Sequence, residues 1–146
     1  MLKSRKFFLE YVSVLRCVTS TAFGGKNFSM SALDILLPNK FSVSYVTAPS
    51  MDIAEMIASR LVEKHLAACV NIVPGLTSVY RWKGAIQKDT EVLMMIKSPT
   101  ESLKELTTFV KSVHPYEVCE VISLPIQHGN PDYLQFLYDA TKGGKH

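Results

Sequence analysis

The sequence contains only three cysteines, Cys17, Cys69 and Cys119, and no two of them have Cys-x-x-Cys spacing. An odd number of cysteines without that spacing argues against a disulfide framework and against a structural zinc site. No apolar run approaches the roughly 20 residues that a bilayer-spanning helix needs, so we expect no transmembrane segment.

Catalytic motifs are also lacking. The chain has no glycine-rich phosphate loop, no His-Glu-x-x-His metal motif and no nucleophile with a recognisable base partner. Glu117 and Glu120 are the one pair suited to acid and base roles, but three residues apart on a strand they would point to opposite faces. We therefore predict that the protein is not an enzyme.

Acidic residues are scarce near the N terminus. Residues 1–29 hold five basic residues and one acidic residue, which leaves 11 basic and 12 acidic residues for the rest of the chain. The net charge of +3 therefore comes from this segment, and we do not expect the remaining domain to bind nucleic acid.

Residues 1–40 are predicted to form a leader. Their basic and hydroxyl residues are typical of a mitochondrial presequence, while a secretory or membrane address and a disordered spacer without any address are the alternatives. Met30 could begin a shorter chain. Without an address, we expect the domain to be cytoplasmic.

Hydrophobic residues make up 47% of the chain, enough for one domain with a core over residues 41–146. Strand patterns cover residues 41–47, 66–84, 90–97 and 118–124, with a hairpin connection at 84–89. Helical patterns cover 52–66, a stretch beginning at the Ser98-Pro99 cap signal, and a last stretch from about residue 131. This β-α-β-β-α-β order predicts an α+β, ferredoxin-like antiparallel sheet with two helices on one face and an extra C-terminal helix.

The longest strand pattern, residues 66–84, is interrupted by Pro74-Gly75. Proline lacks a backbone donor and glycine weakens a strand interior, so the pair predicts a bend or bulge. Tyr80 and the only tryptophan, Trp82, are two residues apart and should share a face of this strand.

Several ordered motifs together resemble the CutA family of divalent-cation tolerance proteins. They are Val46-Thr-Ala-Pro49, Leu66-Ala-Ala-Cys-Val-Asn71, Pro74-Gly75, Ser78-Val-Tyr-Arg-Trp-Lys-Gly84, Glu91, His114-Pro-Tyr-Glu117, Glu120 and Asp132-Tyr-Leu134. The resemblance implies a homotrimer in which the long bent strands pair between subunits. Such pairing would satisfy an edge that otherwise invites aggregation.

Polar and aromatic residues of these motifs predict a ligand cleft at the subunit junction. Its expected residues are Tyr80, Trp82, Lys83, Glu91, Tyr116, Glu117 and Glu120. The competing interpretation is that the aromatic residues pack in the interface and the charged residues form ion pairs between subunits.

The resemblance also implies weak binding of copper or another divalent cation, with no cofactor required. His114 matches a histidine of the family's metal-linked motif, and Cys119 is a weaker candidate. Val46 and Val113 stand where bacterial members often have a cysteine and a second histidine. His128 is a further, weaker candidate ligand, and Cys69 and Cys119 are interpreted as small buried hydrophobic residues.

The sequence therefore predicts a CutA-like homotrimeric binding protein associated with divalent metal-ion tolerance. A small-molecule sensor like the PII signalling proteins is one alternative. Another is a structural role, because animal CutA-like proteins are associated with the processing and membrane anchoring of acetylcholinesterase.

Overall fold

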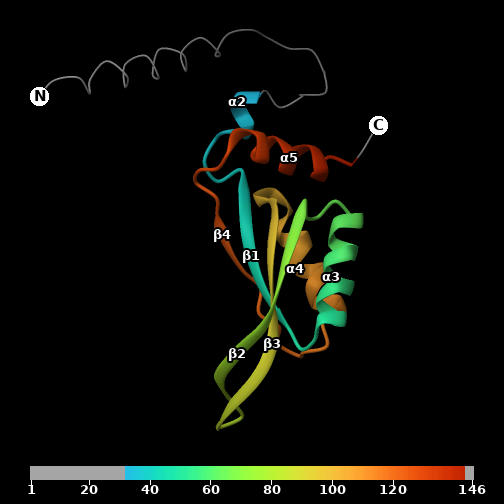
Figure 1. Cartoon of the computed structure of the whole chain (residues 1–146), viewed down its shortest axis with the longest axis vertical. Coiled ribbons are helices and arrows are strands. Elements are labelled where there is room, and N and C mark those ends of the chain that lie inside the picture. Colours follow the sequence, from blue (N-terminus) through green and yellow to red (C-terminus); the bar gives the residue numbers. More distant parts are fainter. Residues whose placement is uncertain (1–31, 144–146) are drawn as a thin grey trace, which may run out of the picture.

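Four antiparallel strands form one sheet in the order β2-β3-β1-β4 (Figure 1). The computed structural model describes residues 32–143, so most of the predicted leader lies outside the described residues. The strands are β1 (Phe41–Ala48), β2 (Cys69–Trp82), β3 (Ala85–Pro99) and β4 (Ile122–Pro125). The helices are α2 (Ala32–Ile35), α3 (Met51–Glu63), α4 (Leu103–Val113) and α5 (Pro131–Thr141), with a 3-10 turn at Thr100–Ser102.

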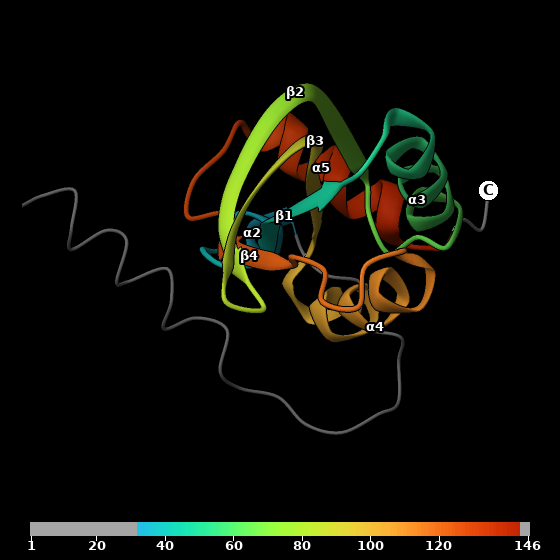
Figure 2. The same ribbon diagram turned by 90° about the horizontal axis from the view of Figure 1, so that it is seen from below.

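Helices α3 and α4 cover one face of the sheet, and α5 runs across one end of it (Figures 1 and 2). This arrangement confirms the predicted α+β, ferredoxin-like fold with an additional C-terminal helix. Within residues 32–143, no helix is long and apolar enough to cross a membrane.

The main core lies between the sheet and the two helices. Met94 and Ile96 of β3 are fully buried there against Leu61 of α3 and Leu106 of α4. Apolar residues at helical spacing place one face of α3 in this core, and the Ser50 hydroxyl caps that helix by accepting a hydrogen bond from the backbone N–H of Ile53.

A second apolar cluster joins α5 to the start of β1. Its buried members are Ile35, Phe41, Ala68, Leu134 and Leu137. Ile35 belongs to α2, so part of the segment before residue 41 packs against the domain and contributes to its core.

The predicted helix start at Ser98-Pro99 is wrong. Strand β3 continues through Pro99, and Ser98 is fully buried opposite Ser42 of β1. Pairing with β1 overrides the local capping signal, and the helix begins only at Leu103.

The predicted connection at residues 84–89 is also wrong, because the hairpin turns within two residues. Lys83 and Gly84 have φ values of 47° and 86°, the left-handed pair that a tight hairpin turn requires. Strand β3 therefore begins at Ala85 and pairs with β2 from that residue onward.

The fourth strand is shorter than residues 118–124, the predicted range. Strand β4 pairs with β1 only from Tyr45 back to Ser42. Further along β1, the Thr47 carbonyl accepts a hydrogen bond from the His114 ring and not from a strand. Residues before Ile122 consequently leave the sheet and are free to line a cleft.

The Pro74-Gly75 break is a β-bulge, as the sequence predicts. Val73 pairs with Leu93, but the next pair is Leu76 with Glu91, so β2 holds one more residue than β3 between these pairs. The extra residue reverses the alternation of side chains along β2. Ser78, Tyr80 and Trp82 therefore lie on the same face as Val73.

Gly75 has a φ of +84°, and a Cβ atom added there would meet no atom within 4 Å. We predict that Gly75→Ala lowers the free energy of unfolding by about 1 kcal/mol through backbone strain alone. Urea unfolding measures this change. Gly143→Ala is the matched control, because its added Cβ makes only an ordinary contact. Equal stability of the two variants would contradict the assigned bulge geometry.

Candidate functional site

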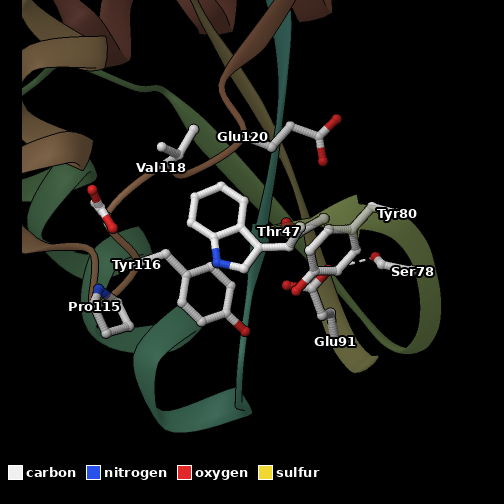
Figure 3. Close-up of a pocket in the computed structure, with 10 residues that line it drawn as sticks. Thr47, Ser78, Tyr80, Glu91, Pro115, Tyr116, Val118 and Glu120 are labelled. Atoms are coloured by element: carbon white, nitrogen blue, oxygen red, sulfur yellow. Dashed lines mark hydrogen bonds between the residues drawn. The ribbon is translucent and has the colours of Figure 1, made fainter. Parts of the chain in front are cut away.

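A cleft of about 540 Å³ lies between the β2–β3 hairpin and the segment that follows α4 (Figure 3). Strand β1 contributes one residue at its end, β2 three, β3 one and the segment 115–120 the other five. The lining residues are Thr47, Ser78, Tyr80, Trp82, Glu91, Pro115, Tyr116, Glu117, Val118 and Glu120.

The β-bulge explains why β2 lines this cleft. Ser78, Tyr80 and Trp82 follow one another at the two-residue period of a strand, on the face that Glu91 of β3 also occupies. Without the extra residue they would point toward the opposite face of the sheet.

Glu91 is the buried charge of the cleft, with 6% of its surface exposed. The Ser78 hydroxyl donates a hydrogen bond to its carboxylate (Figure 3). Tyr116 also lies against it: burial, followed by the charge of Glu91 and a hydrogen bond to it, raises the pKa of the Tyr116 phenol. The phenol of Tyr116 therefore stays protonated beside the Glu91 carboxylate.

Tyr80 is held by a hydrogen bond along the hairpin. Its hydroxyl donates to the Asp89 carboxylate, with 2.6 Å between the two oxygens. That hydrogen bond, followed by a small burial effect and the negative charge of Asp89, raises the pKa of Tyr80 to about 12. The ring is thereby fixed at the cleft as a neutral phenol.

His114 is buried beside the cleft and does not line it. Its Nε2 lies 2.8 Å from the Thr47 carbonyl oxygen and its Nδ1 lies 3.1 Å from the backbone nitrogen of Tyr116. The first nitrogen must donate and the second must accept, so neither has a free lone pair for a metal ion. The histidine fixes the segment 115–120 to the end of β1.

Six of the seven residues predicted for the cleft line it. The exception is Lys83, which lies in the hairpin turn with its ammonium 5.7 Å from the centre of the Trp82 ring. Glu117 and Glu120 both line the cleft, which corrects the expectation that a strand would separate them, because residues 114–121 form no strand.

Of the weaker metal candidates, Cys119 is half-buried and packs against the main core. Val46, which the sequence resemblance places at an expected ligand position, is fully buried. Throughout the part of the chain that the structure describes, no group of three or more His, Cys, Asp or Glu residues is arranged to hold a metal ion.

The sequence reasoning missed Thr47, Ser78, Pro115 and Val118 as lining residues. Ser78 could have been found, because it precedes Tyr80 by two positions and so shares its face. The other three depend on how the segment after α4 docks against β1, which no local pattern encodes.

The cleft is lined mainly by acidic and aromatic side chains. Its lining includes three carboxylates and three aromatic rings, and none of its residues is a lysine, arginine or histidine. Carboxylates attract a cation over distance, and aromatic faces attract it at contact.

The raised pKa of Tyr80 gives a pH prediction. The hydrogen bond to Asp89 stabilises the folded chain below about pH 10, the pKa of free tyrosine, and this contribution is lost as the pH rises through about 12. We expect Asp89→Asn to lower the Tyr80 pKa toward 10, because the variant removes the negative charge. Ultraviolet titration of tyrosinate measures this, and Tyr80→Phe identifies the signal among the six tyrosines. A Tyr80 that ionises near pH 10 in the unmodified chain would contradict the assigned contact.

Comparison with known proteins identifies the family to which this fold belongs. The chain is 49% identical over 134 residues to the CutA homolog of Xenopus laevis, covering 92% of this chain and 86% of that protein. It is 52% identical over 106 residues to protein CutA of Mus musculus, covering 73% of this chain but only 60% of the mouse protein.

The crystal structure of CutA1 from Oryza sativa superposes with a TM-score of 0.70 and 44% sequence identity, covering 75% of this chain and 99% of that one. The family model described as CutA1 divalent ion tolerance protein matches residues 42–140. This range includes all four strands of the sheet apart from Phe41, the first residue of β1. This chain therefore belongs to the CutA1 divalent ion tolerance protein family.

Proposed function

We propose that this protein acts in divalent-cation tolerance as a homotrimer without enzymatic activity, and that it binds cations in the cleft between the hairpin and residues 115–120. The observation that carries the proposal is the composition of that cleft. Three carboxylates line it without a basic side chain, and one of them, Glu91, is almost fully buried.

The exposed hairpin supports the trimer. Strand β2 is an edge strand of 14 residues, so one side of its backbone has no partner within the sheet. Val79 and Ile86 on the hairpin are 65% and 61% exposed. A long edge with apolar side chains is stable in solution when another copy of the chain pairs with it.

Copper or another divalent cation would bind weakly in this cleft. Carboxylate oxygens suit hard cations, whereas copper prefers imidazole and thiolate ligands. His114 has both ring nitrogens engaged in hydrogen bonds, so it joins the ligands only if one of those bonds breaks. Cleft carboxylates are therefore the expected first contacts of a metal ion.

A sensor role is the second candidate function. Trp82 favours it, because a small molecule entering the cleft would contact its ring. Binding of a metabolite there would make the protein a sensor of the PII type. The role connected with acetylcholinesterase remains a prediction from sequence.

Isothermal titration of the full chain with Cu(II) and Zn(II) tests the proposal. We expect weak binding that is reduced about tenfold or more by Glu91→Gln, because the variant removes the buried charge, and two- to fivefold by Glu120→Gln at the rim. Glu105→Gln on the exposed side of α4 is the matched control and should bind as the unmodified chain does. Absence of binding, or equal binding by all three variants, would refute the cleft as the metal site.

A further inference from the structure

We propose that the cleft binds a linear organic polyammonium ion, a diamine or triamine with its charges separated by methylene groups. The inference rests on the proposed function in that it uses the same cleft, and it names the cation that fits there best. Three features of the described residues point to this chemical class: the uncompensated charge, the aromatic walls and the separation of the carboxylates.

The lining of the cleft holds no basic side chain that could pair with Glu91, whose charge is costly because the residue is buried. Glu91 is more than nine-tenths buried and accepts a hydrogen bond from the Ser78 hydroxyl group, which is a neutral donor. Neutral donors solvate a carboxylate but do not cancel its charge, and a buried ion without a counterion is destabilising. A bound cation with N–H donors would supply the missing charge.

The walls favour an organic cation over a hydrated metal ion. In the single chain, Tyr80, Trp82 and Tyr116 are each about 40% exposed, so part of each ring is free toward the cleft. Such faces bind alkylammonium groups through the cation and through the apolar methylene groups beside it. The chain itself supplies an example, because the Lys83 ammonium lies 5.7 Å from the centre of the Trp82 ring.

The carboxylates are spread along the cleft and do not converge on one point. Glu91 and Glu120 lie in separate parts of the close-up, with aromatic side chains between them (Figure 3). Among the described residues, no three His, Cys, Asp or Glu side chains converge to hold one metal ion, whereas a linear polyamine can place ammonium groups at separate carboxylates. The cleft volume of about 540 Å³ is in the range of small-molecule sites.

Trp82 is the only tryptophan and lines the cleft, so its fluorescence reports binding directly. The experiment titrates the full, metal-free chain with spermidine and with 1,4-diaminobutane, and isothermal titration gives the stoichiometry. Tetramethylammonium tests whether one charge suffices, and magnesium chloride at equal ionic strength tests for simple screening. We expect saturable binding of one spermidine per cleft, about tenfold or more tighter than that of tetramethylammonium.

Carboxylate variants test the residues. Glu120→Gln and Glu117→Gln, both at exposed positions, should each weaken spermidine binding two- to fivefold, and Glu91→Gln should weaken it about tenfold or more. Glu105→Gln should bind as the unmodified chain does. If Glu91→Gln fails to fold, as circular dichroism would reveal, the two rim variants decide the question.

The outcomes separate this inference from the proposed function. Binding of Cu(II) or Zn(II) with no saturable response to spermidine overturns the inference and leaves the proposed function standing. Binding of neither metal nor amine overturns both. Equal affinity for spermidine and tetramethylammonium, or no effect of the rim variants, refutes the assignment of separated charges.

Discussion

One extra residue in β2, at Pro74-Gly75, determines which side chains reach the cleft. Because a strand alternates its side chains, inserting a single residue exchanges the two faces for everything that follows. The bulge brings Ser78, Tyr80 and Trp82 onto the face occupied by Glu91. The same bulge increases the local twist and carries the hairpin beyond the helices that cover the rest of the sheet (Figures 1 and 2).

The other wall of the cleft depends on His114. Its ring bonds the Thr47 carbonyl on one side and the Tyr116 backbone on the other, and so holds residues 115–120 against the end of β1. His114, which the sequence resemblance implied as a metal ligand, thus has a structural role in this arrangement. Tyr116, Glu117 and Glu120, which line the cleft, lie on the segment that the histidine holds.

Much of this arrangement could be predicted from the sequence, because its strongest signals are local. Hydrophobic periodicity located α3, and the Pro74-Gly75 pair indicated the bulge. The errors at Ser98 and at the start of β4 arose where contacts between distant residues determine the strand ends. Pairing with β1 extends β3 past the capping signal at Ser98. The His114 ring bonds the Thr47 carbonyl, where a longer β4 would have paired. Lys83 was misplaced because it lies in the tight hairpin turn, with a left-handed φ, and a side-chain alternation rule applies only within a strand.

The hairpin that builds the cleft also leaves the outer edge of β2 without a partner strand within residues 32–143. Folding of the domain and pairing with other copies should therefore be nearly inseparable. Sedimentation velocity of the full chain across a wide concentration range tests whether folding and assembly are linked. We expect a single species of three chain masses that loses its folded structure when it dissociates. A stable, folded monomer at micromolar concentration would contradict it.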